Sequence, residues 1–183
     1  MKKKGLTVVE ILVASVIIAV IIYVMTQLYI QGIRFWNLST AQSDLRSTGR
    51  WALAYIEREL RLATRNEAGT PPNLLIPAAP NNDDITYYHP SFDAGGDVIS
   101  DASGNIIWDV NTARILRHVP ARDELEHVRG GSADTFAQMV DSITFEDASI
   151  DAALNDDEIR VTISLLTVAP LHGAITETLI SRI

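Results

Sequence analysis

The 183-residue sequence contains no cysteine. This absence excludes disulfide bonds, thiolate metal sites and a cysteine nucleophile, and it gives no indication of the redox compartment. The length is enough for one ordinary domain with an appended element, and it is too short for two large cores.

Lysine is absent after the fourth residue, because the only lysines of the chain are Lys2, Lys3 and Lys4. All later basic residues are arginines, and the chain carries a formal net charge of −8. Since an acidic globular part repels phosphate groups, we expect no nucleic-acid binding.

The sequence also lacks the short motifs of common catalytic sites, such as the P-loop, the GxSxG elbow and the dinucleotide fingerprint. Four histidines are scattered without metal-ligand spacing; they are His89, His118, His127 and His172. We expect these histidines to be surface or strand residues. We also expect a protein that is not an enzyme and that needs no cofactor.

A long apolar segment, residues 6–30, follows the lysines. About 20 apolar residues cross a bilayer as a helix, and Tyr23 and Tyr29 suit the far interface. A secretory signal peptide is the alternative, but it has a shorter apolar core and a small-residue cleavage site. Because clustered basic residues stay in the cytoplasm, the segment predicts a single-pass membrane anchor with a cytoplasmic N-terminus.

Glu10 is the one charged residue between Lys4 and Arg34. A charged side chain in hydrocarbon costs about 2.5–3.5 kcal/mol on insertion scales, so an acid at this place indicates a functional role. The alternative is an acid close enough to the interface for its carboxylate to reach water.

Helical periodicity continues beyond the anchor over residues 31–66. Small and apolar residues recur there at spacings of three and four, which traces one stripe of a helix; they are Leu38, Ala41, Leu45, Thr48, Ala52, Ile56, Leu60 and Ala63. Glu57 and Arg61 have the spacing of a helical ion pair. The pattern predicts one helix to about residue 66, with an amphipathic second half and with Gly32 as the place where it would most readily bend or loosen.

The pattern changes after Pro72, because residues 73–183 contain short runs of β-branched and aromatic residues. Six strands are predicted; they cover residues 85–88, 105–110, 114–119, 142–145, 158–165 and 174–181. Turn-forming residues separate them, and no internal repeat is evident. We therefore predict an α+β fold in which an antiparallel sheet packs on the amphipathic half of the long helix.

The N-terminal residues resemble the class III signal of type IV pilins and pseudopilins. Lys2, Lys3 and Lys4 match the basic leader. Gly5 matches the residue before the cut, and Leu6 and Glu10 match the first and fifth residues of the mature chain. The resemblance implies that a prepilin peptidase removes residues 1–5 and that Leu6 becomes the N-methylated terminus. The family usually has phenylalanine where this chain has Leu6.

The resemblance also implies partners and a place in the cell. Family members are held in the bacterial inner membrane with a periplasmic head, and then enter a cell-envelope filament. Their partners are the prepilin peptidase, other minor and major pilins or pseudopilins, and an inner-membrane assembly platform. The acid at the position of Glu10 pairs in this family with the methylated amine of a neighbouring subunit.

Residues 41–46 and 56–63 resemble the extended helix of larger minor members, namely J-type pseudopilins and W-type minor pilins. The order of the strands around residues 85–88, 115–117 and 140–145 is also similar. This favours a minor pseudopilin that initiates or caps a pseudopilus in type II protein secretion. A minor pilin of a type IV pilus and a membrane-tethered binding module with a β head are the alternatives.

An oxygen-rich loop contains Asp93, Asp97 and Asp101. Calcium prefers such ligands, and some pseudopilins bind it, but the spacing does not match the EF-hand template. Solvated turns are the favoured interpretation. These acids are therefore kept only as calcium candidates, and no metal site is expected.

Overall fold

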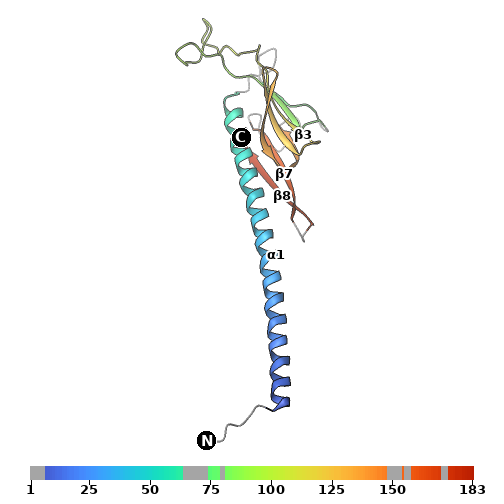
Figure 1. The fold of residues 1–183 in the computed structure, drawn as a ribbon. Coiled ribbons are helices and arrows are strands. Elements are labelled where there is room, and N and C mark those ends of the chain that lie inside the picture. The colour runs from blue at the N-terminus through green and yellow to red at the C-terminus, as the bar shows by residue number, and fades with distance from the viewer. Residues whose placement is uncertain (1–6, 64–73, 79–80, 148–153, 155–157, 170–172) are drawn as a thin grey trace.

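The computed structural model describes residues 7–63, 74–78, 81–147, 154, 158–169 and 173–183. A helix, α1 (Val8–Arg61), is 54 residues long and carries a β-rich head on its C-terminal half (Figure 1). At about 1.5 Å rise per residue, the helix is about 80 Å long. The predicted α+β class is confirmed.

The helix α1 runs through Gly32 without interruption, although this glycine is where the helix was expected to bend or loosen most readily. One exposed glycine costs a helix only about 1 kcal/mol, which the residues around it can absorb. The helix ends at Arg61, earlier than the predicted end near residue 66. A tight last turn closes it, because the Leu62 N–H donates to the Glu59 carbonyl at 3.3 Å and the Ala63 N–H to the Leu60 carbonyl at 2.9 Å.

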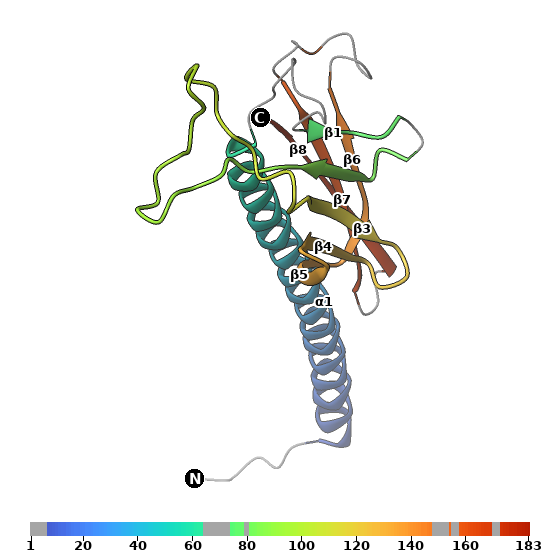
Figure 2. The same cartoon turned by 90° about the horizontal axis from the view of Figure 1, so that it is seen from above.

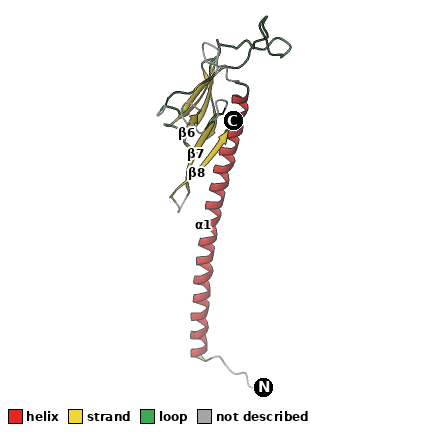
Figure 3. Ribbon diagram, turned by 180° about the vertical axis from the view of Figure 1, so that it is seen from behind, coloured by secondary structure: helices red, strands yellow, loops and turns green. Residues whose placement is uncertain are grey.

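The described part of the head contains two antiparallel sheets instead of the single predicted sheet. The five-stranded sheet has the order β1-β2-β3-β4-β5; its strands are β1 (Leu74–Leu75), β2 (Asp84–Tyr87), β3 (Arg114–Val119), β4 (Glu124–Arg129) and β5 (Ser132–Gln138). The three-stranded sheet has the order β6-β7-β8 (Figure 3); its strands are β6 (Val140–Glu146), β7 (Arg160–Ala169) and β8 (Gly173–Arg182).

The chain passes from one sheet to the other at Met139, which lies between β5 and β6 with a φ of 63°. This left-handed conformation changes the direction of the chain between β5 and β6, so that β6 pairs in a second sheet and does not extend the first. Hydrogen bonds then connect the sheets. The Phe145 N–H donates to the Asn82 carbonyl at 2.8 Å, and His118 Nε2 lies 2.8 Å from the Val140 carbonyl.

The upper half of α1 packs on the head through the predicted stripe. Five of the predicted residues are buried; they are Leu45, Ala52, Ile56, Leu60 and Ala63. Gly49 and Glu59 are buried on the same face. The opposite side of this core comes from β2, β3 and the three-stranded sheet, with Tyr87, Leu116, Phe145 and Leu165 fully or almost fully buried. Figure 2 shows both sheets on one side of the helix.

Five of the six predicted strands are confirmed, and β7 and β8 form a hairpin in which Ala169 pairs with Gly173. The prediction of a strand at 105–110 is wrong, because only isolated bridges occur there. Strand β1 was not predicted, and neither were strands β4 and β5. They are joined by Gly130 and Gly131, whose φ values of 57° and 85° are those of a two-residue hairpin turn.

Candidate functional site

The residues at the start of α1 form a closed capping arrangement around Glu10. The Thr7 N–H and the Thr7 hydroxyl donate to Glu10 Oε2 at 2.7 and 3.0 Å. In return, the Glu10 N–H donates to Thr7 Oγ1 at 3.3 Å. This reciprocal pattern is a capping box, and it satisfies donors at the helix start that have no partner within the helix.

The lower half of α1 is uncovered. Every residue from Thr7 to Trp36 is exposed, including large apolar residues such as Val8, Ile17 and Tyr29. The helix is long and apolar enough to cross a membrane, and a signal sequence near the N-terminus has the same property. Glu10 therefore lies on an exposed apolar rod. Lys2, Lys3, Lys4, Gly5 and Leu6, which carry the processing and leader predictions, lie outside the described residues.

A second polar cluster lies inside the head, around the buried carboxylate of Glu59. Arg114 Nη1 is 3.4 Å from Glu59 Oε2, and His89 Nε2 is 3.5 Å from the same oxygen. Arg58 Nη2 lies 3.7 Å from the other oxygen. The cluster thus connects the end of α1 to β3 and to the segment after β2. We call these residues, with Tyr55, Tyr87 and His127, the Glu59 cluster.

Hydrogen-bond counting assigns the protons in this cluster. The Tyr87 hydroxyl donates to Glu59 Oε2 at 3.1 Å, so it must accept from His127 Nε2, which lies 3.1 Å away. In the neutral form of His127 this proton lies on Nε2, and Nδ1 then accepts from the Tyr55 hydroxyl at 2.8 Å. Four side chains from α1, β2 and β4 therefore form one directed chain that ends on a carboxylate.

Burial governs the titration of this cluster. It lowers the pKa of His127 and the pKa of His89, in both cases chiefly because a charged imidazole is costly to desolvate. Burial also raises the pKa of the Tyr87 hydroxyl, with the nearby Glu59 carboxylate acting in the same direction. The arrangement favours neutral rings and one fixed hydrogen-bond pattern, so it joins helix to sheet with defined geometry.

The histidines and the Glu59 cluster show where sequence reasoning failed. His118 and His127 lie in strands as expected, but His89 is a buried loop residue, and all three are shielded from solvent. His172 lies outside the described residues. Glu59 was not included in the predicted stripe. Its burial could have been predicted, because it lies three residues after Ile56 and therefore on the same face of the helix.

The three calcium candidates lie in the exposed loop before β3. The Asp93 carboxylate accepts from the N–H groups of Gly95 and Asp97, and Asp101 accepts similarly from Ser103 and Asn105. These bonds lower the pKa of the Asp93 carboxyl, chiefly through the Asp97 N–H. The pKa of Asp101 is lowered chiefly by the Asn105 side-chain amide, which donates to Asp101 Oδ2 at 3.0 Å, and then by the Asn105 N–H. Among the described residues, no group of three His, Asp or Glu side chains is arranged to hold a metal ion.

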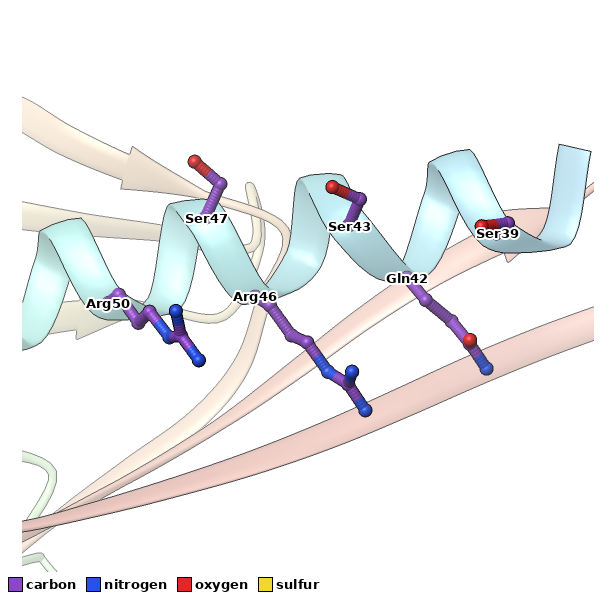
Figure 4. Close-up of a pocket in the computed structure, with 6 residues that line it drawn as sticks. All are labelled: Ser39, Gln42, Ser43, Arg46, Ser47 and Arg50. Atoms are coloured by element: carbon purple, nitrogen blue, oxygen red, sulfur yellow. The ribbon is translucent and has the colours of Figure 1, made fainter. Parts of the chain in front are cut away.

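A polar groove of about 440 Å³ runs along α1 beside the three-stranded sheet (Figure 4). Its lining consists of Ser39, Gln42, Ser43, Arg46, Ser47 and Arg50. Gln42, Arg46 and Arg50 project to one side of the helix, and Arg46 Nε is 2.9 Å from Glu177 Oε1 on β8. Small-molecule sites are mostly apolar and enclosed, so this hydrophilic groove does not resemble one.

The site geometry is thus an exposed apolar rod that begins at a capped acid and ends in a β head. Comparison with protein-family models, curated proteins and solved structures finds no match. What the structure itself shows is a pilin-like architecture, in which a long apolar N-terminal helix is followed by antiparallel β-sheets.

Proposed function

We propose that this chain is a minor pseudopilin, a structural subunit that initiates or caps a periplasmic pseudopilus in type II protein secretion. The observation that carries this proposal is the division of α1. Its upper half is covered by the head, whereas every residue from Thr7 to Trp36 is exposed and Glu10 is the one charged residue of the apolar part.

An uncovered apolar helix needs an apolar environment, because its exposed surface is unfavourable in water. A bilayer supplies that environment before assembly, with the head in the periplasm and the N-terminus in the cytoplasm. Packing against the helices of neighbouring subunits supplies it afterwards. The same residues therefore serve as membrane anchor and as filament core.

Glu10 gives the helix a reason to leave the lipid. Its carboxylate has only the Thr7 donors within the described chain, and no cation lies near it there. Cleavage after Gly5 would create a free amine on Leu6 of each subunit, and the peptidase would then transfer a methyl group to that amine. Pairing of Glu10 with that amine on a neighbour would neutralise both charges and fix the register between subunits.

The mature N-terminus tests the processing step. The full chain is expressed together with a prepilin peptidase, purified in detergent and analysed by mass spectrometry of its N-terminal peptide. We expect a chain that begins with N-methylated Leu6, and we expect Gly5→Leu to keep its leader because a side chain blocks close approach of the backbone. A wild-type chain with an intact leader, or with a cut downstream of Leu6, contradicts the proposal.

The role of Glu10 is tested separately from processing. We expect Glu10→Ala to be inserted and cleaved normally but to be recovered poorly with its partner pilins in a pull-down. Ser15→Ala changes a neighbouring exposed polar residue of the same segment and serves as the control. Recovery of Glu10→Ala at the level of Ser15→Ala would exclude the charge-pair role.

A minor pilin of a type IV pilus would use the same anchor and the same acid, so the proteins that co-purify with the chain distinguish the two machines. A membrane-tethered binding module is the other candidate. It is favoured by the loop between β2 and β3, which exposes apolar residues such as Phe92, Val98 and Ile106 at the end of the head away from the N-terminus.

A further inference from the structure

The long connection between β2 and β3 contains a short tandem repeat. Residues 93–100 read DAGGDVIS and residues 101–108 read DASGNIIW. The two octads agree in their first, second and fourth positions and in the Ile of their seventh. The expectation of no internal repeat is therefore corrected. We call residues 90–110 the octad loop.

The two octads have the same local structure. Each begins with an aspartate whose carboxylate accepts N–H donors two and four residues later, at 2.8 and 2.9 Å in both octads. Gly96 and Gly104 occupy equivalent places with φ values of 88° and 87°. The bridges Phe92–Val98 and Ser100–Ile106 close the two turns. The repeat is thus a repeat of conformation as well as of sequence.

A ring of backbone hydrogen bonds holds the octad loop together. The Ile99 N–H donates to the Ser91 carbonyl, the Ile107 N–H to the Ile99 carbonyl, and the Ser91 N–H to the Ile107 carbonyl, at 2.8 to 2.9 Å. Each of these residues gives one bond and receives one. Three chain segments spaced by eight residues are therefore fixed to one another, and the bridge between Pro90 and Trp108 closes the base.

This ordered loop exposes apolar side chains. Five large apolar residues of the loop are between 42% and 50% exposed; they are Phe92, Val98, Ile106, Ile107 and Val110. The loop projects away from both sheets at the end of the molecule farthest from the N-terminus (Figures 1 and 2). An exposed apolar cluster on a rigid projecting loop is typical of an interaction surface, because loops of this length in compact domains usually have a function.

The charge of the octad loop restricts what it can bind. Its ionisable residues are all acidic, namely Asp93, Asp97, Asp101 and Asp109, and the loop has no Lys or Arg. A membrane with anionic lipids would repel it, and contact between two such loops would bring like charges together. A surface with apolar residues at its centre and basic residues at its edge is complementary to it in both respects.

We propose that the octad loop is a docking surface for a partner protein that presents apolar side chains bordered by lysine or arginine. The exposed apolar residues provide the contact area, and the aspartates orient the partner. This proposal does not depend on the filament role, because it concerns the opposite end of the molecule from Glu10.

The test uses the full-length chain in the cells that produce it. Phe92 is replaced by the photo-crosslinker p-benzoylphenylalanine, and Ile180 on β8, which is 63% exposed, receives the same group as a control. After irradiation, the crosslinked peptide is identified by mass spectrometry. We expect a protein adduct specific to position 92, with a peptide that contains apolar residues and at least one Lys or Arg.

Reversing the charge of one aspartate of the loop distinguishes specific docking from a crosslink made by chance proximity. We expect Asp97→Lys to lower the yield of the adduct about fivefold, and we expect Asp141→Lys, an exposed acid on β6, to leave it unchanged. Asp97 is suited to this change because the carboxylate that accepts the turn hydrogen bonds is that of Asp93, and Asp97 contributes only its backbone.

A third variant tests the apolar part. Ile106→Ser should also lower the adduct yield, whereas Ile180→Ser on β8 should not, and circular dichroism checks that both chains fold. The proposal is overturned if position 92 gives no protein adduct, if the adduct is a lipid or a second copy of this chain, or if Asp97→Lys and Ile106→Ser leave the yield unchanged.

Discussion

Glu59 is the residue whose replacement we expect to cost the head most. Its carboxylate is buried and accepts from the Tyr87 hydroxyl beside Arg114, so Glu59→Ala leaves a mostly buried cation without its acid. Breaking a buried pair in this way costs about 3 kcal/mol or more. Glu57→Ala removes an exposed acid that is paired with Arg61 on the same helix, and it should cost at most about 0.5 kcal/mol. Urea unfolding of the full chain in detergent, followed by tryptophan fluorescence, gives both values; equal losses would contradict the buried role of Glu59.

The same cluster predicts how stability depends on pH. In the unfolded chain a histidine has a pKa of about 6.5, and burial holds the pKa of His127 and the pKa of His89 below that in the head. The unfolded chain therefore binds more protons as the pH falls below about 6.5, and stability falls with it. We expect the melting temperature to drop from pH 7 towards pH 5, and His127→Gln to make that drop smaller. If the melting temperature of His127→Gln drops between pH 7 and pH 5 as much as that of the wild type, protonation of His127 is excluded as a cause of the drop.

At the scale of elements, the two glycines of α1 allow a matched comparison. A Cβ at Gly49 would lie 2.6 Å from the Leu165 Cδ1 and closer still to the Leu179 Cδ1, whereas a Cβ at Gly32 meets nothing within 4 Å. Overpacking costs about 1–3 kcal/mol, which exceeds the gain of about 1 kcal/mol from replacing a helical glycine by alanine. We expect Gly49→Ala to lower the melting temperature of the head and Gly32→Ala not to lower it. Calorimetry of both variants in detergent decides, and an unchanged or higher value for Gly49→Ala would contradict close packing of α1 on β7 and β8.

The helix stripe and most strands could be predicted because their burial follows the period of the element. Leu45, Ala52 and Ile56 recur at helical spacing, and β7 shows regular alternation. Strand β4 could not be found in this way. The pairing with β5 shifts register between Leu125 and Glu126, and three residues in succession are buried. One of the three is an acid paired with Arg117 and Arg122. Neither a bulge nor an ion pair between residues four and nine positions apart leaves a periodic signal of a strand in the sequence.

Glu10 could be predicted as a functional residue from the sequence, whereas the polar and apolar clusters of the head could not. Glu10 was evident from sequence because a single acid in a long apolar run stands out without any knowledge of the fold. The Glu59 cluster and the octad loop were not evident. The first gathers residues from α1, β2, β3 and β4 that are far apart in the chain. Part of the octad loop was predicted as a strand over residues 105–110, because Ile106 and Ile107 are β-branched. Their exposure follows from the ring of backbone hydrogen bonds that holds the loop, and this ring has no sequence signal.

At the scale of the whole molecule, the head should be independent of the anchor. Buried residues of α1 begin at Leu45, and every residue before Asn37 is exposed within the described part of the helix. A chain that starts at Arg34 should therefore fold as a soluble monomer and keep the melting temperature of the full chain to within about 2 °C, because no core residue is removed. Size-exclusion chromatography and circular dichroism without detergent test this. An unfolded or aggregated fragment would show that the apolar half of α1 stabilises the head.

Because α1 is continuous through Gly32, the direction in which the head faces is fixed relative to the apolar half of the helix. With no hinge between the apolar half and the head, the direction in which the octad loop points is set by the rotation of the anchor about its own axis. Each inserted helical residue turns the head by about 100°. Seven inserted residues at Asn37 would restore the direction to within about 20°, whereas five would turn it by about 140°. In the proposed filament, the seven-residue insertion should lengthen the subunit and keep the direction of the head, whereas the five-residue insertion should turn the head away from its neighbours. We therefore expect the seven-residue variant to enter the filament more readily than the five-residue variant.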